Sequence, residues 1–119
     1  MILVRITDKA KWEQAKTLGV FNGELEVDGF VHLVKPDQVQ KVANVAFIGR
    51  NDLMLLVLHK ARIHSSIQEE DIYGSGELFP CLYGALNLEA VMMVLDFPVS
   101  EDGLFKLPRR LTMLMQKFL

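Results

Sequence analysis

An uninterrupted apolar run, Leu53–Leu58, constrains the fold more than any other feature of this sequence, because all six of its side chains need burial. A run of this length is typical of a strand that is covered on both faces. A second run of six, Ala90–Leu95, indicates a further strand. Both runs are far shorter than the ~20 residues that cross a bilayer, so we expect no membrane span.

The elements around these runs do not alternate regularly between strand and helix. Trp12, Ala15 and Leu18 recur at helical spacing between a capping residue, Asp8, and a helix-ending Gly19. The elements expected on either side of the central run are a strand at 2–7, a helix at 9–18, a loop at 21–28, a strand at 30–34, a helix at 36–47, an edge strand at 67–71, strands at 82–86 and 91–97, and a helix from 108. This order predicts an α+β domain and not a parallel doubly wound sheet.

Length and composition narrow the class of protein. The 119 residues are expected to form a single domain, 1–119. Half of the residues are apolar and 24% are charged, which excludes a disordered chain, and the net charge of −2 argues against a nucleic-acid partner. Because Cys81 is the single cysteine, no internal disulfide can form, and the reducing cytoplasm is the expected compartment. One cysteine and three scattered histidines do not match zinc-ligand spacing, so we expect no metal.

The C-terminal segment, 108–119, is predicted to be a basic amphipathic helix appended to the domain. Four bases and no acid occur between residues 104 and 119: Lys106, Arg109, Arg110 and Lys117. The apolar face of the helix would consist of Leu111, Leu114, Met115 and Phe118. This face packs either on the core or against a partner, which includes a second copy of the chain in a homodimer.

His32 is the polar residue that stands out, because it lies inside the apolar strand expected at 30–34. Strand alternation puts His32 on the same face as Phe30 and Val34. A buried imidazole has two ring nitrogens to satisfy. His32 is therefore either a core histidine bonded to the backbone or a donor that faces a ligand.

Two further residues are candidates for chemistry. Glu70 belongs to the acidic run at 69–71, which is either solvated surface or the source of a carboxylate that turns into a site. Cys81 is either a small buried apolar residue or a nucleophile, and the second role needs a base nearby and a lowered pKa.

Several separated segments, in the same order, resemble the bacterial family known as domain of unknown function 952. The resemblance covers residues 4–108. Its segments are Trp12-Glu13 through Gly19, Gly29-Phe30-Val31-His32-Leu33-Val34, a proline-initiated helix at 36–47, the strand at 53–58, Glu70, and Phe79-Pro80-Cys81-Leu82-Tyr83-Gly84.

The resemblance implies a small ADP-ribosyltransferase-like domain, in which two small antiparallel or mixed sheets form a cleft and about three helices lie outside. In such a fold His32 would contact the ribose of NAD, and Cys81 would take the place of a second signature histidine beside the nicotinamide. The implied catalytic residues are Glu70 and Cys81, and the implied substrate-binding residues are His32, Phe30, Tyr83 and Phe79.

Two positions depart from the family pattern: Cys81 replaces the second histidine, and Val34 replaces a polar residue. A thiol is a weak donor and mostly protonated at pH 7, whereas an imidazole exchanges a proton near neutral pH. The departures argue for weak or absent activity. Two functions therefore stay open: a nucleotide-binding cleft that transfers or hydrolyses ADP-ribosyl groups, and a catalytically degenerate module that binds a ligand or a protein. No obligate cofactor is expected, and NAD enters as a substrate.

Overall fold

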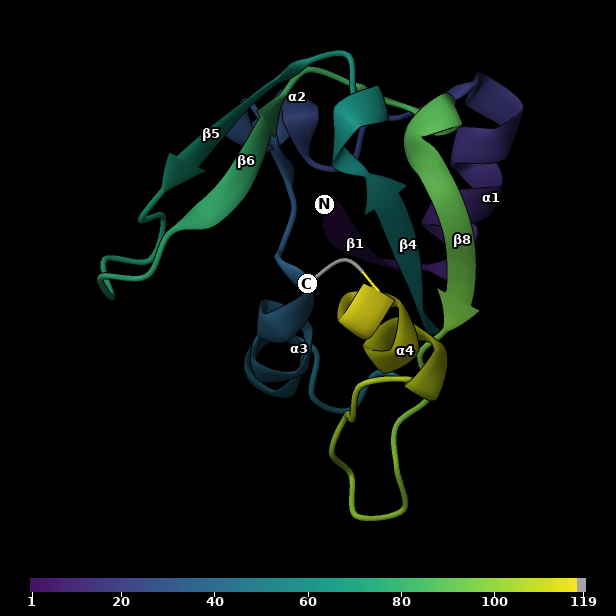
Figure 1. The fold of residues 1–119 in the computed structure, drawn as a ribbon. Coiled ribbons are helices and arrows are strands. Elements are labelled where there is room, and N and C mark those ends of the chain that lie inside the picture. Colours follow the sequence, from purple (N-terminus) through teal and green to yellow (C-terminus); the bar gives the residue numbers. More distant parts are fainter. Residues whose placement is uncertain (118–119) are drawn as a thin grey trace.

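The computed structural model describes residues 1–117 and is built around an antiparallel central sheet (Figure 1). The sheet consists of β1 (Ile2–Asp8), β4 (Leu53–His59) and β8 (Val91–Asp96), in the order β1-β4-β8. β4 is the middle strand, and residues 55–58 within it are completely buried. The apolar run at 53–58 is thus a strand covered on both faces, as its composition predicts.

Two smaller antiparallel sheets complete the β structure of residues 1–117. One contains β3 (Val31–His32), β6 (Phe79–Tyr83) and β5 (Ser66–Glu70) in the order β3-β6-β5, and the other pairs β2 (Val20–Phe21) with β7 (Leu86–Asn87). In Figure 1, β5 and β6 form an arm that extends away from the central sheet. The expectation of two sheets is therefore corrected to three, within an α+β domain.

Gly84 separates two strands that the sequence pattern merges at 82–86. Its φ of +154°, and the Ser65 side chain that a Cβ there would overlap, require glycine at the point where the chain leaves one sheet for the next. At the other end, Pro80 lies inside β6 without the N–H of an ordinary strand residue, and its carbonyl accepts from the Leu33 N–H at 3.1 Å. The strand therefore begins at Phe79 and not at 82.

Three helices of similar length lie around the sheets, and one short helix and three 3-10 turns lie in the connections between strands. The helical elements are α1 (Lys9–Leu18), the one-turn α2 (Leu25–Asp28), α3 (Val39–Ala46), α4 (Arg109–Lys117), and 3-10 turns at Pro36–Gln38, Lys60–Arg62 and Leu88–Ala90. Asp8 caps α1 as predicted, since its carboxylate accepts from the Lys11 N–H at 2.8 Å. The loop expected at 21–28 instead contains α2. No helix within residues 1–117 has the length and hydropathy to cross a membrane.

Strand alternation divides the core into two clusters, one on each face of the central sheet. Ile2, Val4 and Ile6 of β1 belong to the cluster that α3 and α4 cover. Leu3 belongs to the other cluster, which α1 and the β3-β6-β5 sheet cover through residues such as Ala15. The period of two in β1 therefore places one apolar layer on each side of the sheet.

The C-terminal helix contributes to the first of these clusters. Leu111 of α4 is completely buried, and Leu114 and Met115 pack against the same cluster. Phe118, which the pattern places on the same face, lies outside the described residues. Core packing is therefore the role that the structure gives to the apolar face of α4 up to Met115.

Candidate functional site

His32 and Cys81 lie directly opposite each other where β3 pairs with β6. The pairing of β6 with β5 likewise sets Phe79 opposite Glu70. Opposite residues of an antiparallel pair point to the same side of the sheet, and so do residues two apart in one strand. Five of the six predicted site residues therefore share one face: His32, Glu70, Phe79, Cys81 and Tyr83. The sixth, Phe30, joins them through ring contacts.

Cys81 is the most deeply buried member of this face. None of its surface is exposed, and its Sγ lies 3.6 Å from the carbonyl oxygen of Phe79. Burial raises the pKa of the Cys81 thiol to about 11, and the charges of Glu70 and Glu69 add to the rise. The thiol is therefore protonated throughout the neutral range, where a thiolate nucleophile is disfavoured.

Glu70, Tyr83 and Phe30 form the outer part of the face. The Tyr83 hydroxyl donates a hydrogen bond to the Glu70 carboxylate, and this bond is the main reason that the pKa of Tyr83 rises to about 12. The ring of Phe30 lies 4.6 Å from the ring of His32 and 5.5 Å from that of Tyr83, measured between centroids. The face thus presents aromatic rings beside a carboxylate that is already hydrogen-bonded.

A carboxylate at the end of α2 contacts the imidazole of His32. Its Nε2 lies 2.8 Å from Oδ2 of Asp28, the last residue of α2. Gly29, with a φ of +82°, turns the chain between α2 and β3 and so allows residues four apart to meet. The His32 side chain remains 31% exposed, which leaves it accessible to a ligand.

An ion pair beside His32 is a part of the site that sequence reasoning missed. Nη1 of Arg5 donates to Oε1 of Glu24 at 2.6 Å and to the carbonyl oxygen of His32 at 3.1 Å. The same Glu24 oxygen accepts from the backbone N–H of His32. Arg5 is only 6% exposed and its guanidinium lies over the ring of Phe21, 4.9 Å from the centroid. Its buried Nε has no hydrogen-bond partner within residues 1–117.

The charge state of this pair follows from its geometry. Partial burial by itself would raise the pKa of Glu24, but the hydrogen bond and charge of Arg5 outweigh it and hold the pKa below its ordinary value. Glu24 is therefore a carboxylate at neutral pH, and the pair carries no net charge. Because it joins β1, the N-terminal end of α2 and β3, the pair also fixes the backbone that carries His32.

The signal that could have identified Arg5 is its place in β1, where it interrupts a run of apolar residues. A charged residue at such a position normally points to solvent, so the sequence pattern does not reveal its burial. Glu24, its partner, lies in the segment interpreted as a loop.

A cavity of about 140 Å³, which we call the Arg5 hollow, lies beside this pair. Arg5, Glu24 and His32 form its polar wall, and Tyr73 and Phe79 contribute to its apolar wall. The rings of Tyr73 and Phe79 meet edge to face at 5.4 Å. The hollow therefore adjoins the face described above and shares two of the six predicted site residues with it.

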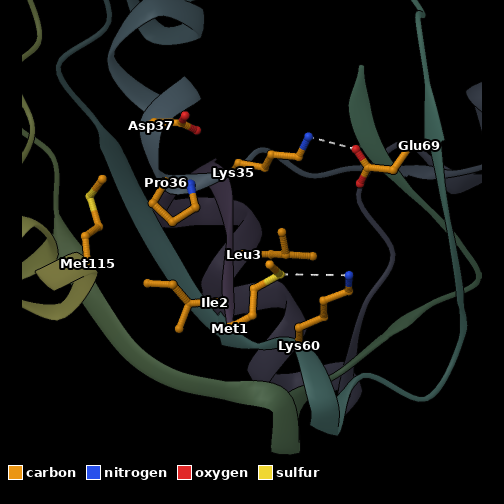
Figure 2. Close-up of a pocket in the computed structure, with 9 residues that line it drawn as sticks. All are labelled: Met1, Ile2, Leu3, Lys35, Pro36, Asp37, Lys60, Glu69 and Met115. Carbon is orange, nitrogen blue, oxygen red and sulfur yellow. Dashed lines mark hydrogen bonds and ion pairs between the residues drawn. The ribbon is translucent and has the colours of Figure 1, made fainter. Parts of the chain in front are cut away.

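A larger cavity, of about 550 Å³, lies at the start of β1 (Figure 2). Its lining includes the apolar residues Ile2, Leu3 and Met115, and the ammonium group of Lys35 pairs with the Glu69 carboxylate across one side at 2.9 Å. All six predicted site residues lie within residues 1–117, and none of them lines this cavity.

The side chains of the site can form hydrogen bonds, contacts between aromatic rings and a ligand, and ion pairs. Within residues 1–117, no three side chains of the metal-binding types His, Cys, Asp and Glu converge closely enough to hold a metal ion.

Comparisons with known proteins place the chain in a family. The family described as "Protein of unknown function (DUF952)" matches residues 6–94. The crystal structure of protein CC0527 from Caulobacter crescentus has a TM-score of 0.83 to this chain at 30% identity, and the match covers 94% of this chain and 99% of that one. The solution NMR structure of CC0527 gives a TM-score of 0.80 at 31% identity, with 94% and 97% covered. Among curated proteins there is no match. The chain therefore belongs to the DUF952 family, and its fold is similar to that of CC0527.

Proposed function

We propose that this protein binds a nicotinamide nucleotide, with NAD as the reference ligand, and that it turns the ligand over weakly or not at all. The observation that carries the proposal is the register that sets His32 opposite Cys81, next to the Arg5 hollow. The segments at 29–34 and 79–84 resemble the DUF952 family, and the proposed likeness of that family to ADP-ribosyltransferase-like domains suggests the ligand class. The proposed setting is the cytoplasm, where reducing conditions suit a single free thiol.

The proposed binding mode uses the groups that the face presents. The accessible imidazole of His32 would hydrogen-bond a ribose hydroxyl, and the rings of Phe30 and Tyr83 would contact a base. At about 140 Å³ the Arg5 hollow is smaller than the roughly 300–1,000 Å³ of sites that enclose a whole ligand. It would therefore take one end of the ligand, while the rest lies along the face.

Binding is favoured over turnover by the state of the two predicted catalytic residues. A thiol with a pKa of about 11 does not exchange protons near pH 7 as an imidazole does, so Cys81 is poorly suited to acid–base work. Glu70 already accepts the hydrogen bond from Tyr83. The catalytic roles expected for Glu70 and Cys81 stay predictions.

A second candidate function is ADP-ribosyl transfer or hydrolysis, and the position of Glu70 on the same face as His32 favours it. In this reaction the bond between the ribose carbon and the nicotinamide nitrogen breaks, and nicotinamide leaves with the bonding electrons. Glu70 would stabilise the cationic ribosyl group while water or an acceptor forms the new bond and loses a proton.

Isothermal titration calorimetry with NAD, ADP-ribose and nicotinamide mononucleotide tests the proposal. We expect saturable heat with at least one of these ligands, and a loss of about tenfold in affinity for His32→Ala, since one hydrogen bond to a ligand is of that order. His64→Ala, which changes an exposed histidine that is not one of the six predicted site residues, is the control and should bind as the parent does. No heat with any ligand, from a folded sample, would count against the proposal.

The two candidate functions are separated by a chemical assay. Chromatography of NAD incubated with the protein should show nicotinamide release at the uncatalysed rate if the protein only binds. Release well above that rate, abolished by Glu70→Gln, would instead support transfer or hydrolysis.

A further inference from the structure

We propose that Arg5 and Glu24 together form a recognition subsite for an uncharged carboxamide group that enters the Arg5 hollow. The proposal rests on the proposed function in using the same hollow, and it assigns a role to two residues outside the predicted site. It identifies the chemical group that the hollow selects, and it does not depend on which larger molecule carries that group.

The first observation is an incompletely satisfied guanidinium. Arginine has five N–H donors in a planar fork. Both hydrogen bonds that Arg5 makes within residues 1–117 start from Nη1, one to Glu24 and one to the carbonyl oxygen of His32. The buried Nε has no partner there, although a buried donor without a partner costs about 1–3 kcal/mol. Nε has almost no accessible surface, so a ligand oxygen cannot reach it, but Nη2 is not sealed in this way and makes no hydrogen bond within residues 1–117. Nη2 is thus the donor that is available to an acceptor oxygen.

The second observation concerns the oxygens of Glu24. Oε1 accepts both from Nη1 of Arg5 and from the backbone N–H of His32. No hydrogen bond within residues 1–117 involves Oε2. The pair therefore combines a free donor, Nη2 of Arg5, with a free acceptor, Oε2 of Glu24, and a primary carboxamide offers the matching acceptor oxygen and donor N–H₂.

The charges at the hollow decide between a carboxamide and a carboxylate. The low pKa of Glu24 keeps it ionised, so its charge already neutralises Arg5. Asp28, 2.8 Å from the His32 ring, adds another carboxylate nearby. A ligand carboxylate would place one more negative charge beside these groups, with no unpaired cation to compensate it. A neutral amide makes the same contact with Arg5 without that cost.

The shape of the hollow suits a small group. Its volume of about 140 Å³ and apolar wall residues such as Tyr73, Phe79 and Val42 fit a short hydrocarbon body behind the amide. We therefore choose isobutyramide and isobutyrate as matched probes, because they have nearly the same shape and differ in charge and in the N–H donor.

Nuclear magnetic resonance with ¹⁵N-labelled protein tests the subsite, because the Nε–H of Arg5 gives its own signal. Isobutyramide should shift this signal saturably, and isobutyrate should bind at least about tenfold more weakly. Arg5→Lys keeps the charge beside Glu24 but loses the fork, so amide binding should fall about tenfold. Arg50→Lys changes an exposed arginine elsewhere and should leave binding unchanged.

The sharpest variant is Glu24→Gln, which leaves Arg5 with an uncompensated charge. It should reverse the preference, so that isobutyrate binds more tightly than isobutyramide. If neither Arg5→Lys nor Glu24→Gln folds, the comparison of the two probes on the unmodified protein still decides the matter.

Two results would overturn the subsite. One is an Nε–H signal of Arg5 that isobutyramide does not shift, with the proton exchanging only with water. The other is equal affinity for the two probes. The two proposals fail separately. Absence of heat with nucleotides, together with a shift of the Arg5 signal by isobutyramide, would remove the nucleotide proposal and keep the subsite. Nucleotide binding that leaves the Arg5 signal unchanged would remove the subsite alone.

Discussion

The reactivity of Cys81 at raised pH should show that its thiol is buried, because a catalytic thiol would ionise at a lower pH. The pKa of Cys81 is raised from 9.0 to about 11 in the folded protein, mainly by burial. At pH 8 its thiolate population is then roughly 100-fold lower than that of an ordinary cysteine, because each unit of pKa is a factor of ten. Alkylation of the native protein at pH 8 should be slower than that of the unfolded protein by at least this factor.

The same shift makes a prediction for stability. The folded pKa lies above the unfolded one, so the contribution of Cys81 is complete below pH 9 and is lost as the pH rises towards 11. By pH 10 the unfolded thiol is mostly ionised and the folded one mostly is not. The loss at that pH is about 1.4 kcal/mol, the value of one pKa unit.

Urea unfolding at pH 8 and at pH 10, with Cys81→Ala as the reference, isolates this term because all other titrating groups are common to both proteins. The parent should lose about 1.4 kcal/mol relative to the variant between the two pH values. A difference that does not change with pH, or a native thiol that reacts with an apparent pKa near the ordinary value of about 8.5, would refute the reasoning and reopen a nucleophilic role for Cys81.

Three further predictions concern the fold and the face. Leu111→Ala should lower the free energy of unfolding by about 2–5 kcal/mol, since it empties a fully buried site; a change below 1 kcal/mol in urea unfolding would contradict the packing of α4. Gly84→Ala should cost about 1–3 kcal/mol, because its Cβ would overlap Ser65 at a positive φ, and an unchanged midpoint would show that the turn adapts freely. Ultraviolet titration should find a tyrosine with a pKa of about 12, and Glu70→Gln should lower it towards the usual value of about 10, because a neutral amide replaces the charged acceptor of the Tyr83 bond; an unchanged titration would mean that Tyr83 does not bond the Glu70 carboxylate in solution.

Much of the fold follows from local patterns. The helix at 9–18 has its cap and its stop in the sequence, and the strand at 53–58 is specified by continuous apolarity. The face follows only in part, because His32 lies within an expected strand whereas Cys81 precedes the strand expected at 82–86, and it is the resemblance that links the two segments. Their pairing residue against residue is a property of the sheet that neither segment specifies alone.

The remainder depends on contacts between distant residues. The Arg5–Glu24 pair joins β1 to the residue that precedes α2, and a charged residue in either position normally points to solvent. The division into three sheets depends on Gly84 and on the Ser65 side chain beside it, which are far apart in the sequence. The burial of Cys81 likewise arises from packing that its own segment does not specify.

The central claim is that one face of the β3-β6-β5 sheet and the Arg5 hollow form a ligand site. Mapping the backbone amide shifts that NAD causes in the ¹⁵N spectrum tests this claim most directly. The account predicts that the largest shifts fall at Arg5, His32, Phe79 and Cys81. Shifts that cluster instead at Ile2, Leu3 and Met115, around the cavity of Figure 2, or no shifts at all, would contradict it.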